Sequence, residues 1–140
     1  MEELQLSAVR VRRQDGILIL AVVGELDLLT AGVLDREFAT LAALGHSRIV
    51  LNVEGLTFCD ARGLRVLIRA GNRATAMQGW LRLVGAVAQL LRVLEITCTA
   101  RVLPAFASLD DALEPDAASA VVGGSSGSIA AAANVLPETV

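Results

Sequence analysis

The segment from residue 49 to residue 68 changes its hydrophobic period from that of a strand to that of a helix. A short apolar, β-branched run first predicts a buried strand: Ile49, Val50, Leu51 and Val53. Residues with helical spacing then predict one buried helix face: Leu64, Leu67, Ile68 and Gly71. The chain is therefore expected to fold around a βα unit with a tight loop between strand and helix.

Asp60 stands at the change of period. A carboxylate there can cap the free N–H groups of the first helical turn, and the helix macrodipole favours negative charge at that end. Asp27 follows the strand expected at residues 17–23, and functional groups in open α/β sheets collect at the carboxyl ends of the strands. The corner around Asp60 and Asp27 is the best candidate for a functional surface.

The other periodic segments predict one α/β domain, residues 1–114. Further strands are expected at residues 6–13, 81–84 and 101–103, and helices after Thr30 and Ser108 and over residues 87–94. Residues 24–27 are expected to form a loop. From residue 115 to residue 140, Ala, Ser and Gly dominate, which predicts a disordered tail. Its GGSSG run matches G-x-S-x-G, but it follows no predicted strand, so we interpret it as a flexible linker.

Composition excludes several classes of function. A net charge of −3 and an aromatic content of 3% do not suit a nucleic-acid binder. All twelve basic residues are Arg, which excludes Schiff-base chemistry and a P-loop lysine. No motif combines a nucleophile, a base and a pocket, so we expect neither an enzyme nor a cofactor. Cys59 and Cys98 are isolated, so no metal site is expected.

The sequence also predicts where the protein works. The N-terminus lacks a signal-peptide pattern, and the longest strongly apolar run, residues 17–23, is far shorter than a membrane span. We expect a cytoplasmic protein with no membrane partner. His46 falls in a predicted loop without a nearby carboxylate or thiol, and is expected to be a solvated surface residue.

Two segments resemble the STAS domain of bacterial anti-sigma factor antagonists: LTFCDARGL at residues 56–64, and GELD at residues 24–27. The resemblance covers roughly residues 5–114. It implies a single α/β domain with a mixed sheet of about four or five strands, flanked by about four helices. It also implies the function: binding a kinase-like, ATP-binding anti-sigma factor, so that a sigma factor is freed for transcription.

One position departs from the pattern of this family. The residue after the aspartate is usually a serine that the anti-sigma factor phosphorylates, whereas this chain has Ala61 followed by Arg62. We therefore expect no phosphorylation here, and an antagonist that works without the usual serine switch. In the resembling family, the acidic loop that corresponds to residues 24–27 and the loop that corresponds to residues 58–64 both face the partner.

The expected partner-binding residues combine this resemblance with the helix edge that follows: Asp27, Phe58, Asp60, Ala61, Arg62, Gly63, Leu64, Arg65, Val66 and Arg69. For three of them a structural interpretation stays open. Asp60 can be a plain N-cap, worth about 1 kcal/mol. Asp27 can be an ordinary exposed aspartate before a helix. Gly63 either lets a partner approach closely or packs inside the domain.

Arginines form a second pattern on the helix after Asp60. Their spacing of 3, 4 and 4 residues places them on one stripe, opposite the apolar face: Arg62, Arg65, Arg69 and Arg73. A solvated face is one interpretation. An acidic partner helix is the other, and it is favoured by Val66, whose helical angle predicts an apolar side chain among the arginines.

Two other classes of function remain open. The same surface would serve a STAS scaffold module in another signalling or transport assembly, without a sigma factor. A small-molecule or nucleotide sensor is less well supported, because no Gly-rich phosphate loop follows a predicted strand.

Overall fold

The computed structural model describes residues 6–12, 15–99 and 101–114. Its strands are β1 (Leu6–Arg12), β2 (Leu18–Leu26), β3 (Arg48–Cys59), β4 (Trp80–Val84) and β5 (Ala105–Phe106). Its helices are α1 (Ala31–Ala43), α2 (Ala61–Ala76), α3 (Ala88–Ile96) and α4 (Leu109–Leu113). The strands form one sheet in the order β1-β2-β3-β4-β5. Only β1 is antiparallel to its neighbour within this sheet, so the mixed α/β architecture expected from the sequence is confirmed.

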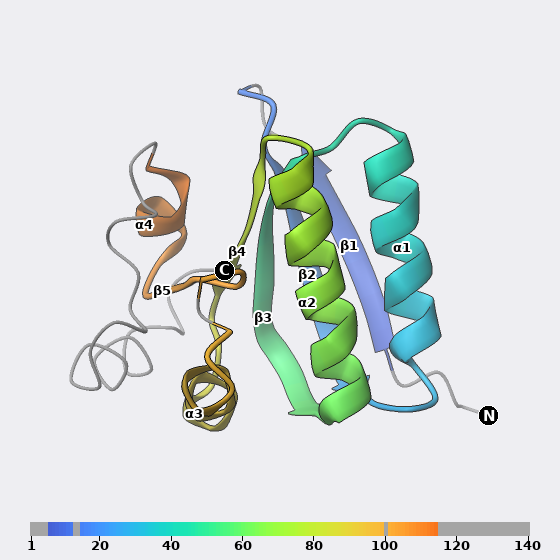
Figure 1. The fold of residues 1–140 in the computed structure, drawn as a ribbon, viewed down its shortest axis with the longest axis vertical. Helices are drawn as coiled ribbons and strands as arrows, with labels where there is room; N and C mark the ends of the chain where they lie inside the picture. Colours follow the sequence, from blue (N-terminus) through green and yellow to red (C-terminus); the bar gives the residue numbers. More distant parts are fainter. Residues whose placement is uncertain (1–5, 13–14, 100, 115–140) are drawn as a thin grey trace.

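The two faces of the sheet are covered differently. Helices α1 and α2 lie side by side over one face, and α4 lies apart from them, beyond β4 and β5 (Figure 1). The larger core lies between the sheet and α1, α2 and α3, whereas α4 closes a smaller cluster around Val50, Val84 and Phe106. In the larger core, Leu20, Leu51 and Leu83 of successive strands are each 0% exposed.

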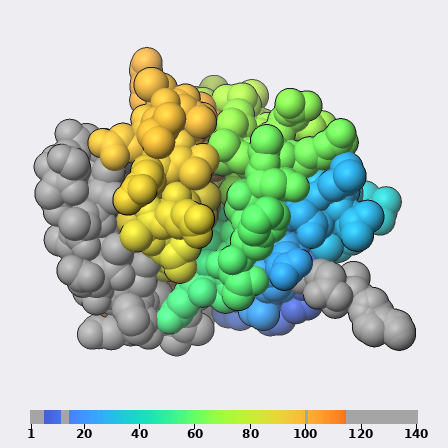
Figure 2. All heavy atoms as spheres, turned by 90° about the horizontal axis from the view of Figure 1, so that it is seen from below, coloured from blue at the N-terminus to red at the C-terminus, as the bar shows by residue number. Residues whose placement is uncertain are grey.

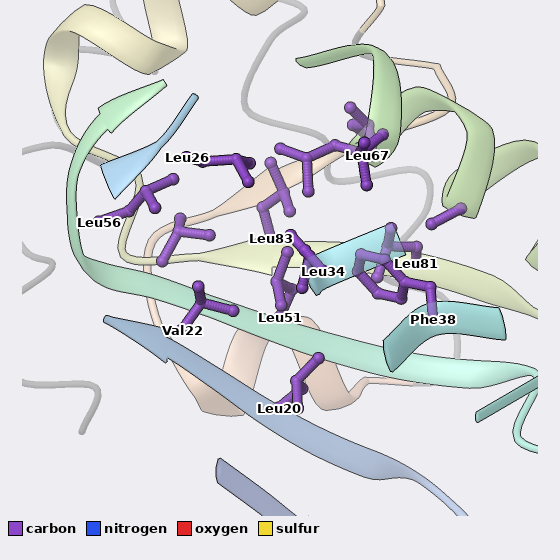
Figure 3. Packing of buried hydrophobic residues seen from close by; sticks show 14 of the residues in the cluster. Leu20, Val22, Leu26, Leu34, Phe38, Leu51, Leu56, Leu67, Leu81 and Leu83 are labelled. Carbon is purple, nitrogen blue, oxygen red and sulfur yellow. The ribbon is translucent and has the colours of Figure 1, made fainter. Parts of the chain in front are cut away.

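Side chains of the helices complete this core (Figure 3). Leu34 and Phe38 of α1 and Leu67 of α2 point onto the leucines of the sheet, and all three are at most 2% exposed. Burying one such side chain stabilises the fold by about 1.5 to 3 kcal/mol. The helical spacing that predicted the apolar face of α2 is confirmed, because Leu64 and Leu67 are both buried.

The strands of the central unit run further than their apolar runs predicted. β2 continues through residues 24–26, which were expected to be a loop, and β3 continues to Cys59. Two register shifts allow the strands to keep pairing, so that Glu25 lies opposite Phe58 and Leu26 opposite Cys59. The tight loop expected before α2 is thereby reduced to Asp60.

The expected strand at residues 101–103 is wrong. Val102 and Leu103 donate their backbone N–H groups to the Thr99 carbonyl in a turn, so they are not free to pair in the sheet. The last strand in the described part of the chain is β5, which begins just after Pro104. The cap at Ser108 is confirmed, because its hydroxyl accepts the Asp111 N–H at 3.1 Å. Residues 115–140, with the GGSSG run, lie outside the described residues.

Thr30 and His46 differ from expectation. Thr30 is the N-cap of α1, but its side chain caps no helix N–H; the hydroxyl instead donates to the Glu25 carbonyl at 2.7 Å. His46 is half-buried rather than fully solvated, at the end of α1 opposite Arg73. None of the helices in the described part of the chain is long and apolar enough to cross a membrane.

Candidate functional site

The loop after β2 and the start of α2 meet at one edge of the sheet. The Asp60 N–H donates to the Leu26 carbonyl at 3.1 Å, which joins the end of β2 directly to the start of α2. Figure 2 looks onto this edge: the green atoms of the β3–α2 junction lie between the blue atoms of the β2–α1 loop and the yellow atoms of α3. Asp27 and Asp60 are thus neighbours across β2 and β3, as the parallel strands predicted.

Each carboxylate orders the backbone where a helix begins: Asp60 is the N-cap of α2, whereas Asp27 closes the turn that precedes α1. The Asp60 carboxylate accepts the Gly63 N–H at 3.0 Å. The Asp27 carboxylate accepts the N–H groups of Leu29 at 2.9 Å and Thr30 at 3.1 Å. Both aspartates are half-buried. Their structural role is therefore real, and any contact with a partner comes in addition to it.

Gly63 is needed for packing inside the domain. A Cβ atom on this glycine would lie 2.5 Å from the Leu26 Cγ and 2.8 Å from the Leu26 carbonyl oxygen. Atoms cannot approach so closely without a shift, and backbone yields less readily than a flexible side chain. Of the two interpretations of Gly63, the structure supports close packing of α2 against the end of β2.

Two further residues expected on the partner-binding surface are buried. Val66 is 5% exposed and Leu64 is 8% exposed. Val66 does lie among the arginines of α2, as its helical angle predicted, but it offers a partner little apolar surface, because α1 lies beside α2 and Ala31 lines the same concave surface. The hydrophobic pattern of α2 predicts which face packs on the sheet, but it does not predict that α1 covers a second face.

Exposed apolar side chains surround the start of α2. Phe58 is 51% exposed, Leu28 58%, Leu29 83% and Val87 44%. All four lie at or just after the carboxyl ends of β2, β3 and β4. We call them the apolar rim. Sequence reasoning missed Leu28 and Leu29, although a pair of leucines between a strand and a helix fits neither period. It also placed Val87 inside the helix expected over residues 87–94, whereas Val87 is the exposed N-cap of α3.

A small hollow adjoins the apolar rim. It has a volume of about 110 Å³, and Phe58, Cys59 and Val87 are among the residues that line it. Burial raises the pKa of the Cys59 thiol to about 11, and the neighbouring Asp60 carboxylate adds to the rise. Since the thiolate is the reactive form, this cysteine is a poor nucleophile at neutral pH.

The arginines provide the positive charge of this region. Arg62 and Arg65 are exposed on α2, and Ala61 is exposed beside them. Arg69 is also exposed and lies 3.7 Å from the Asp35 carboxylate of α1. Within the described ranges, no three His, Cys, Asp or Glu side chains are grouped so that they could hold a metal ion. What this edge offers is an apolar surface beside a cationic one, which suits binding of a protein.

The sequence profile of the STAS domain family matches residues 8–112. The chain belongs to this family. The match includes every strand and helix of the described fold except the first two residues of β1 and the last residue of α4. A comparison with curated proteins gives no match.

Solved structures share the fold of this STAS domain. An anti-sigma factor antagonist from Mycobacterium paratuberculosis has a TM-score of 0.68 and 23% identity, over 77% of this chain and 91% of that chain. The Bacillus cell fate determinant SpoIIAA in its phosphorylated form has a TM-score of 0.61 and 17% identity, over 76% of this chain and 96% of that chain. The anti-sigma factor antagonist SpoIIAA in its unphosphorylated form has a TM-score of 0.56 and 19% identity, over 64% and 83%.

Proposed function

We propose that this STAS protein is an anti-sigma factor antagonist, which binds an anti-sigma factor through the apolar rim and so frees a sigma factor. The observation that carries the proposal is the exposure of Phe58 and Leu29 beside the half-buried Asp60. Large apolar side chains contribute favourably to binding when a partner buries them in the core of an interface. The similar solved structures described as anti-sigma factor antagonists support this assignment.

The protein acts by binding rather than by catalysis. The Asp60 carboxylate caps α2, the Asp27 carboxylate closes the turn before α1, and burial favours the neutral thiol of Cys59. These groups are thus committed to structure and do not form a nucleophile and base pair. The partner is an anti-sigma factor of the serine kinase-like, ATP-binding type, and the complex forms in the cytoplasm.

Ala61 removes the switch by which such antagonists are turned off. It is the first residue of α2 and is exposed, where a serine would be open to a kinase. A phosphate there would place about two negative charges beside Asp60 and within the interface. Without a hydroxyl, this protein stays in its binding-competent form or answers to a regulator other than a kinase.

The test replaces Ala61 with Asp in the full chain and measures affinity for the anti-sigma factor that co-purifies with the parent. A buried charge in the interface should weaken binding by about 1 to 3 kcal/mol. The control is Ala76→Asp, at the exposed far end of the same helix, which should bind like the parent. In the Ala61→Ser variant, the anti-sigma factor should transfer a phosphate from ATP to the new serine, and mass spectrometry detects the phosphorylated protein.

Two results would contradict the proposal. If the Ala61→Asp variant binds as tightly as the parent, the start of α2 is outside the interface. If native pull-downs from cytosol yield an assembly without an anti-sigma factor, the alternative applies, in which this protein is a STAS scaffold module in another signalling or transport assembly.

A further inference from the structure

A groove runs between α1 and α2 on the side of these helices that faces solvent. Its volume is about 190 Å³. Gly32 and Asp35 of α1 line one wall, and Arg62, Arg65 and Arg69 of α2 line the other. We call it the arginine groove. It begins at Arg62, next to Ala61, so it continues the proposed partner-binding edge along α2.

The groove has more positive than negative charge. Three exposed arginines face one acidic residue, Asp35, which pairs with Arg69. Among the described residues, no carboxylate forms a salt bridge with Arg62 or Arg65. The whole chain has a net charge of −3, so this cationic strip runs against the overall charge. Charge complementarity therefore favours an acidic occupant.

The spacing of the arginines suits a helix. Arg62, Arg65 and Arg69 are separated by three and four residues, and an α-helix rises about 1.5 Å per residue. The stripe is thus about 10 Å long. A second helix lying along the groove, with carboxylates at the same spacing, would meet each arginine in turn. Residues three, four and seven positions apart share one face of a helix, so carboxylates at this spacing would all point into the groove.

Gly32 gives a second, independent reason to expect that a partner binds in the groove. It is exposed in the first turn of α1, and a Cβ atom added there would meet nothing within 4 Å. Because nothing lies near that Cβ position, packing within the described domain does not require a glycine there. Glycine also makes a helix less stable than alanine does. The absence of a side chain leaves room for the backbone of a partner to approach the wall of the groove closely.

We propose that the arginine groove binds an acidic helix of the partner protein. The inference rests on the proposed function, because the partner is the anti-sigma factor. Asp35 fits this arrangement: it holds Arg69 at the far end of the stripe, and Arg62 and Arg65 remain available to the carboxylates of the partner helix.

The experiment measures binding of the full chain to the co-purified anti-sigma factor at two salt concentrations. The double variant Arg62→Glu/Arg65→Glu should bind at least tenfold more weakly at low salt, and its affinity should depend less steeply on salt. Arg92→Glu, an exposed arginine on α3, is the matched control and should bind within twofold of the parent. Gly32→Leu keeps all the charges but fills the groove, and should also weaken binding tenfold.

A Phe58→Ala variant separates the two proposals. If it binds weakly while the double arginine variant and Gly32→Leu bind like the parent, the groove inference is wrong and the proposed function stands. If the parent binds no anti-sigma factor, both fail. Hydrogen–deuterium exchange on the complex should show protection of an acidic helix of the partner, and replacing the carboxylates of that helix with arginine should restore binding of the double variant.

Protection of a loop or of an uncharged helix instead would overturn the inference.

Discussion

Two glycines show how differently one residue type serves this fold. Gly63 lies against Leu26, with no room for a Cβ atom, whereas Gly32 stands in open space at the start of α1. The first is required for α2 to pack on the end of β2. The second has no structural reason within the described residues. The same substitution at the two positions should therefore have opposite effects.

Replacing Gly63 with Ala should lower the free energy of unfolding by about 1 to 3 kcal/mol, since the new methyl group overlaps Leu26. Replacing Gly32 with Ala should raise it by up to about 1 kcal/mol through helix propensity. Urea denaturation of both variants checks the pair. Equal stability of parent and Gly63→Ala would mean that α2 and β2 are packed less closely than described.

Cys59 predicts a dependence of stability on pH. Its pKa is raised from 9.0 to about 11 in the folded protein, first by burial and then by Asp60. Because the folded state favours the neutral thiol, this contribution to stability is fully present below about pH 9 and is lost as pH rises toward 11. Unfolding free energies from pH 8 to 11 should fall more steeply for the parent than for Cys59→Ala. Parallel curves would show that the thiol is not buried as described.

At the scale of elements, one arginine attaches α4 to the sheet. Arg82 of β4 is 3% exposed, and its guanidinium donates to the carbonyls of Ala112 at 2.8 Å and Glu114 at 3.0 Å. The guanidinium carbon also lies 3.7 Å from the centroid of the Trp80 ring. Burial lowers the Arg82 pKa. The positive charge complements the carbonyls at the end of the helix, where the dipole is negative.

Arg82→Met should therefore destabilise the protein by about 2 to 4 kcal/mol, because it removes two charge-assisted hydrogen bonds and leaves the carbonyl of the buried Ala112 unpaired. Arg92→Met, at an exposed position on α3, is the control and should change stability by less than about 0.5 kcal/mol. Urea titration followed by Trp80 fluorescence measures both. A loss of less than about 1 kcal/mol for Arg82→Met would show that α4 is held by apolar contacts alone.

At the scale of the whole molecule, we propose that the domain ends at Glu114. This residue is the C-cap of α4, and the family profile ends at residue 112. The second core cluster also depends on α4, since Ala112 is 0% exposed and Leu109 and Leu113 pack against that cluster. A truncation just after α4 and one just before it should therefore behave differently.

Removing residues 116–140 should leave the melting midpoint nearly unchanged, by differential scanning calorimetry. Removing residues 108–140 should lower it strongly, because Ile17, Val50 and Phe106 lose the helix that covers them. If removal of residues 116–140 lowers the melting midpoint by more than about 5 °C, the domain boundary lies beyond Glu114. In a domain of this size, such a drop corresponds to a loss of about 1 kcal/mol in the free energy of unfolding.

The sequence by itself determined the local features of this protein. The hydrophobic faces of α1, α2 and α3, the caps at Asp60 and Ser108, the βα corner and the STAS resemblance could all be read from it. The physical reason is that a period or a cap involves residues three or four positions apart, and their side chains interact whatever the rest of the chain does.

The tertiary structure alone decided what depends on distant segments. β2 reaches Leu26 because β3 continues to pair with it, and Val66 is buried because α1 lies beside α2. The apolar rim likewise gathers side chains from the end of β3 and from the connections that follow β2 and β4. Burial on a second face and convergence at one edge result from contacts between elements, and no window of neighbouring residues contains them.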